Sequence, residues 1–175
     1  SLANQLLLSH YFGTSSALDA YWLGMAIVTT VIFFYGPLRV ALVPECVRKL
    51  AVSPHEGSRF FSAAMNFIML VTASCCLMLL VFPEEIASLT VSSSSNQILE
   101  ATMPLLPGLV AFCFLQCLTE IFNGLLIARH KILFQSIGKI LGGVCSVLFL
   151  FFLAESFGIV AMIYGMIAAQ VILLL

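Results

Sequence analysis

Three polar residues recur at helical spacing inside one long apolar stretch of the sequence. Gln116, Glu120 and Asn123 stand at positions i, i+4 and i+7, so a helix over this stretch carries them on one face. A carboxylate and two amides on one face can take up a proton, coordinate a cation or hydrogen-bond a polar ligand. All three residues are therefore candidates for a substrate path.

A second polar stripe follows in the next apolar stretch. Gln135, Lys139 and Ser146 stand at i, i+4 and i+11, again on one helix face. Glu120 lies nine residues before Arg129 and Lys139 lies ten residues after it, so a hairpin turning at Arg129 brings both to nearly the same depth. We predict an ion pair between Glu120 and Lys139. Such a pair either holds two helices together or adjoins a transport path.

Arg39 is a further candidate for the substrate path. It follows Gly36 and Pro37, where the missing backbone donor of proline kinks or loosens a helix. A guanidinium there can bind a phosphate or pyrophosphate through two hydrogen bonds. A second role, equally consistent with the sequence, is that the Arg39 side chain extends to the nearby membrane surface.

The sequence shows no arrangement typical of covalent catalysis or of a metal centre. Cys113 and Cys117 share a helix face, but no histidine or carboxylate is spaced to complete a metal site with them. No Ser-His-Asp set and no glycine-rich phosphate loop occurs. We therefore expect a protein that is not an enzyme, with no catalytic residues, no cofactor and no metal.

The composition shows which elements must position these residues. Of the 175 residues, 62% are apolar and 9% are charged, against roughly 45–50% and about 25% in soluble domains. Uncharged stretches approach the ~20 residues that a helix needs to cross a bilayer. A net charge of −1 with no basic run excludes nucleic-acid binding. The class is therefore an all-α, polytopic transmembrane bundle rather than a soluble enzyme, a disulfide scaffold or a disordered chain.

Five to six spans account for the hydrophobic pattern. Because the first and the last are cut short, we expect the chain to be a piece of a longer protein. The predicted spans cover 1–12, 19–44, 60–82, 101–128, 133–154 and 157–175.

Charges in the predicted loops indicate an orientation. Five of the seven basic residues lie in 45–59 and 128–132. The intervening loops carry acidic residues and neither lysine nor arginine. By the positive-inside rule, 45–59 and 128–132 are cytoplasmic.

Two stretches resemble a known family. The run from Tyr11 to Tyr21, Tyr-Phe-Gly-Thr-Ser-Ser-Ala-Leu-Asp-Ala-Tyr, resembles the start of the MurJ (MviN) family of lipid II flippases, where a Phe-Gly and a small-residue loop precede Asp-Ala-aromatic at the second helix. The run from Asn123 to Ile132 is similar to that family's turn between helices four and five, a Leu-x-Ala-Arg-x-basic-apolar pattern. The chain thus resembles the multidrug/oligosaccharidyl-lipid/polysaccharide exporter superfamily.

This resemblance implies a two-lobed transporter of the bacterial plasma (inner) membrane, with residues 1–175 in the N-terminal lobe. Such a protein flips a polyprenyl-pyrophosphate-linked glycan, lipid II or a related cell-wall precursor, by alternating access. The implied partners are the lipid-linked glycan, the bilayer, the C-terminal lobe and a coupling ion, H⁺ or Na⁺. Asp19 matches an aspartate of functional weight in the family. Where the family tends to have Pro and then Asn in helix five, this sequence has Lys139 and Gly143.

Two alternatives stay open at this point. A cation-coupled multidrug antiporter of the same superfamily predicts a cavity with acidic and aromatic lining. A membrane scaffold that carries no substrate predicts that the polar stripes of the fourth and fifth spans bury against each other and leave no wet cavity.

Overall fold

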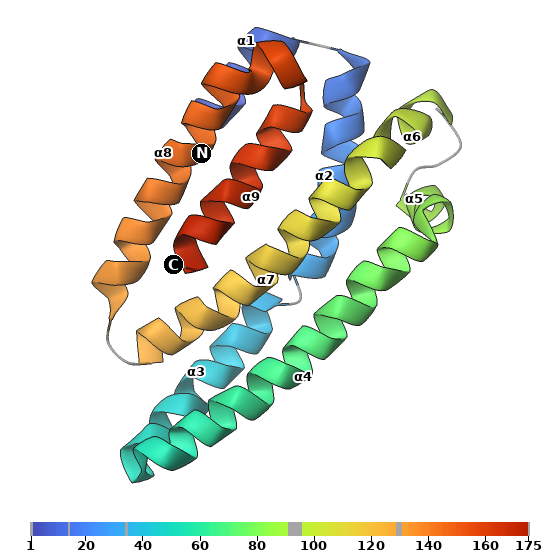
Figure 1. The fold of residues 1–175 in the computed structure, drawn as a ribbon. Coiled ribbons are helices and arrows are strands. Elements are labelled where there is room, and N and C mark those ends of the chain that lie inside the picture. The colour runs from blue at the N-terminus through green and yellow to red at the C-terminus, as the bar shows by residue number, and fades with distance from the viewer. Residues whose placement is uncertain (1, 14, 34, 91–95, 129–130, 175) are drawn as a thin grey trace.

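The computed structural model describes residues 2–13, 15–33, 35–90, 96–128 and 131–174. Within these ranges the chain is helical and contains no strand, which confirms the all-α prediction (Figure 1). In chain order the elements are α1 (Leu2–Phe12), α2 (Ser16–Phe33), α3 (Tyr35–Val52), α4 (Pro54–Val81), α5 (Pro83–Thr90), α6 (Asn96–Thr102), the 3-10 turn η1 (Met103–Leu105), α7 (Leu106–Ala128), α8 (Ile132–Phe157) and α9 (Val160–Leu174).

Four helical stretches are long and apolar enough to cross a membrane. They are Ser16–Val52, Pro54–Val81, Ile98–Ala128 and Leu133–Phe157, with α9 as a shorter apolar helix. Only 19% to 39% of their most apolar windows is buried inside the protein. Large apolar side chains therefore cover the outer surface, among them Phe67, Leu70, Leu133, Phe134 and Phe152, each at least 67% exposed. Such an apolar surface is typical of a protein surrounded by lipid.

The predicted second span differs from the structure at its far end. The prediction ends at Pro44, whereas α3 runs through Pro44 to Val52. Pro37 is the third residue of α3, where its missing N–H costs no intrahelical bond. Past Pro44 the helix is stabilised by packing along α4, where Gly57 leaves room for the side chain of Leu50.

Two further helices, α4 and α8, extend beyond their predicted spans, because the residues at their ends cap the helix outside the apolar run. The third span was expected from residue 60, but α4 begins at Pro54, because Ser53 is extended and its hydroxyl accepts a hydrogen bond from the His55 N–H at 3.2 Å. The fifth span was expected to end at 154, but α8 continues to Phe157. It stops at Gly158, whose φ of +57° suits glycine and whose N–H donates to the Ala154 carbonyl in the last turn of the helix.

The central helix of the bundle is α7. It packs against α2, α3, α4 and α9 (Figure 1). The most extensive pairing in the fold joins α8 to α9, and α9 in turn lies along α7. The buried core includes Tyr21 of α2, Leu109 of α7 and Ile163 of α9. Packing of α8 onto the rest of the bundle therefore runs mainly through α9.

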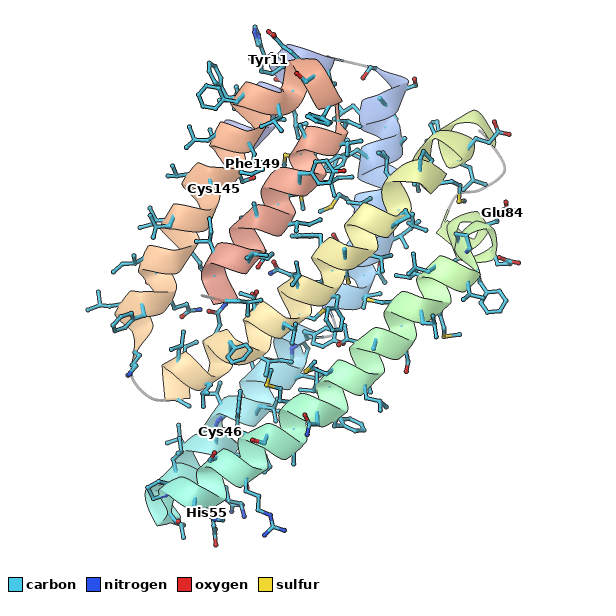
Figure 2. All side chains as sticks on the ribbon, viewed as in Figure 1. Tyr11, Cys46, His55, Glu84, Cys145 and Phe149 are labelled. Atoms are coloured by element: carbon cyan, nitrogen blue, oxygen red, sulfur yellow. The ribbon has the colours of Figure 1, made fainter. Side chains whose placement is uncertain are left out.

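The helix ends that flank the two predicted cytoplasmic segments lie toward one end of the bundle. In Figure 1 the α3–α4 junction, the end of α7 and the start of α8 lie toward the lower end, while the end of α1, the start of α2 and the α8–α9 junction lie toward the upper end. Figure 2 accordingly places His55 and Tyr11 at opposite ends. This arrangement fits the charge pattern, and the side of the membrane that each end faces stays a prediction.

One hydrogen bond joins α3 and α4 within the apolar core. The Thr72 hydroxyl donates its only proton to the Ile68 carbonyl at 2.7 Å, so the Tyr35 hydroxyl is the donor in the bond between Tyr35 and Thr72. Both side chains are buried.

Replacing Tyr35 by phenylalanine should lower the free energy of unfolding by about 0.5–1.5 kcal/mol, because Thr72 keeps its own bond to Ile68. Thr72→Val should cost more, since it leaves the Tyr35 hydroxyl buried without an acceptor. Denaturation in mixed detergent micelles measures both values. An equal or larger loss for Tyr35→Phe would contradict this assignment of the donor.

Candidate functional site

Two cavities lie on different sides of α7. The first, the Glu120 cavity, lies between α3, α4 and α7, and its volume of about 20 Å³ has room for about one water molecule. Its lining is apolar and aromatic except for Glu120, and includes Tyr35, Phe61 and Ile68. Glu120 lies eight residues before the end of α7 at Ala128, or about 12 Å along the helix. A carboxyl group therefore stands at membrane depth in apolar surroundings.

The second cavity, the Lys139 hollow, is larger and more polar. Its volume is about 350 Å³, and α1, α2, α7, α8 and α9 all contribute lining residues. Its polar groups come from Lys139 and Ser146 of α8 and from Gln170 of α9. Lys139 lies seven residues into α8, about 10 Å from the helix start. The ammonium group is exposed in this hollow rather than buried between helices.

The predicted ion pair between Glu120 and Lys139 is wrong. Among the residues that the structure describes, no salt bridge joins them, and each lines a different cavity. The prediction assumed that α7 and α8 pack along their lengths as a hairpin. In the structure α8 instead packs along α9, and α9 contacts α7, so equal depth does not bring the two charges together.

Instead of pairing with Lys139, Glu120 is hydrogen-bonded to Gln116 in the same helix, and Gln116 is bonded to Gln170 of α9. Gln170 donates through Nε2 to Oε1 of Gln116, and Gln116 donates through Nε2 to Oε1 of Glu120 at 3.4 Å. Gln170 is the residue that the sequence analysis missed. Gln170 could have been found in the sequence as the one amide in an otherwise uncharged, apolar run.

Of the remaining candidates, the structure describes the side chains of Asn123 and Asp19. Asn123 is 3% exposed, and its Nδ2 has no hydrogen-bond partner among the described residues. Asp19 is an exposed residue of the first turn of α2 and is not among the residues that line either cavity. Arg39 belongs to α3, and its side chain lies outside the described residues. The structure thus brings Gln116 and Glu120 together, and Lys139 lines a cavity that Glu120 does not line.

Four long apolar helical stretches, with polar side chains at membrane depth, define a multi-pass membrane protein. Within that class the chain belongs to the MurJ family: the family described as lipid II flippase MurJ matches residues 8–175. The resemblance found in the two sequence stretches is therefore confirmed.

A solved structure shows the same fold. The chain is similar to a protein described as "Lipid II flippase MurJ, inward closed conformation", with a TM-score of 0.70 and 23% sequence identity. The match covers 96% of this chain and 36% of that one, so the chain spans about a third of the length of that flippase. No curated protein matches the chain by sequence.

Proposed function

We propose that the protein containing this chain moves lipid II, or a related polyprenyl-pyrophosphate-linked glycan, across the bacterial inner membrane by alternating access. Family membership over residues 8–175 is the observation that carries this proposal. This chain then forms part of the N-terminal lobe, and a second lobe encloses the path with it. The coupling ion is H⁺ or Na⁺.

The Lys139 hollow suits one part of such a substrate. The Lys139 ammonium group attracts phosphate and donates to its oxygens, and the polar side chains of Ser146 and Gln170 line the same hollow. Tyr21, Trp22 and several aliphatic side chains line the hollow around this contact. Asp19, Arg39, Gln116, Glu120, Asn123 and Lys139 remain the residues proposed for the substrate path.

The alternatives differ in what the cavities offer. A scaffold without substrate predicts polar stripes buried against each other with no wet cavity, and a hollow of about 350 Å³ beside Lys139 counts against it. A cation-coupled multidrug antiporter is the second candidate, because the Glu120 cavity combines a carboxyl group with the aromatic rings of Tyr35 and Phe61.

Asp19→Asn should abolish lipid flipping by the full two-lobed protein. Its charge lies at the beginning of α2, where the helix dipole stabilises it by only about 0.3–1 kcal/mol. The variant should therefore still fold, and its defect should be one of transport. The measurement follows translocation of a fluorescent undecaprenyl-pyrophosphate saccharide by protein reconstituted in liposomes.

Glu84→Gln is the matched control, since Glu84 is also in the first turn of a helix outside the cavities, α5 (Figure 2). It should flip the lipid at the wild-type rate. Equal rates in the wild type and Asp19→Asn would remove Asp19 from the path. A wild type that flips no lipid under any gradient but exports a dye in a cation-dependent manner would replace the flippase proposal with the antiporter.

A further inference from the structure

A further cavity lies at the end of the bundle where α3 meets α4, the end that His55 marks in Figure 2. Its volume is about 330 Å³, within the range of about 300–1,000 Å³ that small-ligand sites occupy. We call it the Lys49 pocket, and its lining consists of Lys49, Glu56, Arg59, Phe60 and Ala63. These residues line neither the Glu120 cavity nor the Lys139 hollow. The Lys49 pocket is therefore separate from both.

The Lys49 pocket lies where the lipid-facing surface of α4 begins. Its charged residues precede Phe60, the first residue of the predicted third span. Further along α4, Phe67 and Leu70 are both 67% exposed. Phe60, Phe67 and Leu70 stand at i, i+7 and i+10, so one face of α4 leads from the pocket along the apolar surface. A lipid whose headgroup occupies the pocket can therefore lay its acyl chains along this face.

Two cations and one carboxylate line the Lys49 pocket without pairing with one another. Among the residues that the structure describes, no salt bridge joins Glu56 to Lys49 or to Arg59. Elsewhere on α3, Arg48 does pair with Glu45, with 2.6 Å between Nη2 and Oε1. The three charges of the pocket are therefore available to a ligand, whereas the charge of Arg48 is already engaged.

A zwitterionic phospholipid headgroup matches this set of charges. Lys49 and Arg59 attract a phosphate and donate hydrogen bonds to its oxygens. The carboxylate of Glu56 accepts hydrogen bonds from a primary ammonium group. Phosphoethanolamine carries both groups on one short link. A choline headgroup has no N–H to donate, and a phosphatidylglycerol headgroup has a net negative charge that the carboxylate repels.

We propose that the Lys49 pocket binds the headgroup of phosphatidylethanolamine, with the phosphate at Lys49 and Arg59, the ammonium at Glu56 and the acyl chains along α4. Lys49 belongs to α3 and the other two residues to α4, so the bound lipid bridges two helices that pack against each other. The positive-inside rule predicts that this end faces the cytoplasm. The site does not depend on what the protein transports.

Native mass spectrometry of the full protein measures this binding, with phosphatidylethanolamine, phosphatidylcholine and phosphatidylglycerol of identical acyl chains added in turn. The wild type should bind phosphatidylethanolamine most tightly. Lys49→Met and Arg59→Met should each lower that affinity about fivefold, the usual effect of one basic side chain at a lipid surface. Lys49→Arg should retain it. Glu56→Gln should lose most of the preference over phosphatidylcholine and should bind phosphatidylglycerol more tightly than the wild type does.

Arg48→Met is the matched control, because Arg48 lies beside Lys49 in the chain but does not line the pocket. It should keep the wild-type affinity for all three lipids. An equal loss in Arg48→Met and Lys49→Met would overturn the pocket as the site, because any nearby cation would then serve. A wild type that prefers phosphatidylglycerol, or a preference that Glu56→Gln leaves unchanged, would overturn the assignment of the ammonium to Glu56. The assay follows lipid binding rather than translocation, so these outcomes leave the proposed flippase function untouched.

Discussion

Lys139→Met should reduce flipping of a lipid-linked pyrophosphate by the full protein at least about tenfold. Lys139 supplies the charge of the larger cavity, and one charge-assisted hydrogen bond is worth roughly 1.5–3 kcal/mol, which corresponds to about tenfold or more. Methionine has similar length and no charge. It also removes the cost of placing a lysine in a membrane span, roughly 2.5–3.5 kcal/mol at the centre, so the variant should fold at least as well as the wild type.

Lys131→Met is the control for this prediction. Lys131 is exposed at the beginning of α8, with its Nζ 5.9 Å from the centre of the Phe134 ring, and it does not line the hollow. Its loss should leave the rate of translocation in liposomes unchanged, and Lys139→Arg should retain most of it. Full activity in Lys139→Met would show that the hollow does not hold the pyrophosphate.

Gly142→Val should destabilise the protein by at least about 1–3 kcal/mol, the usual range for an overpacked interface. A Cβ atom at Gly142 would lie 3.0 Å from the Ala169 carbonyl oxygen and 3.4 Å from the Ala169 Cβ. The facing helix α9 also has a glycine at this contact, because a Cβ at Gly165 would lie 3.0 Å from the Ser146 carbonyl oxygen. Backbone atoms cannot move aside without separating α8 from α9. Small residues at such crossings are a common means of packing helices in membranes.

Gly143→Val makes the same chemical change one residue further along α8, where a Cβ would meet nothing within 4 Å. Both variants carry the same change in helix propensity, so the difference between their unfolding free energies in mixed micelles isolates the contact with α9. Equal stabilities would show that α8 and α9 do not approach each other this closely. Because Gly143 lines the Lys139 hollow, transport activity is not a suitable readout here.

Properties that depend on local sequence were predicted well. Span length and hydropathy are local properties, so the apolar runs predicted an all-α membrane bundle. The stretches at Tyr11–Tyr21 and Asn123–Ile132 indicated the MurJ family, whose model matches residues 8–175. Helix ends were less accurate. Ser53 with Pro54 is a start signal outside the apolar run, and the helix continues through Pro44 because packing along α4 offsets the lost bond.

Residue spacing along the chain was enough to predict the type of each polar residue at membrane depth, its helix face and its distance from the nearest loop, because a helix converts sequence spacing directly into angle and rise. Which helix faces meet depends on how the helices pack in three dimensions. Neighbouring helices in sequence need not pack along their lengths, and here α9 is the main partner of α8. Glu120 therefore joins Gln116 and Gln170 in one row, while Lys139 lies in a separate hollow, because depth orders residues along one axis and lateral packing settles the other two.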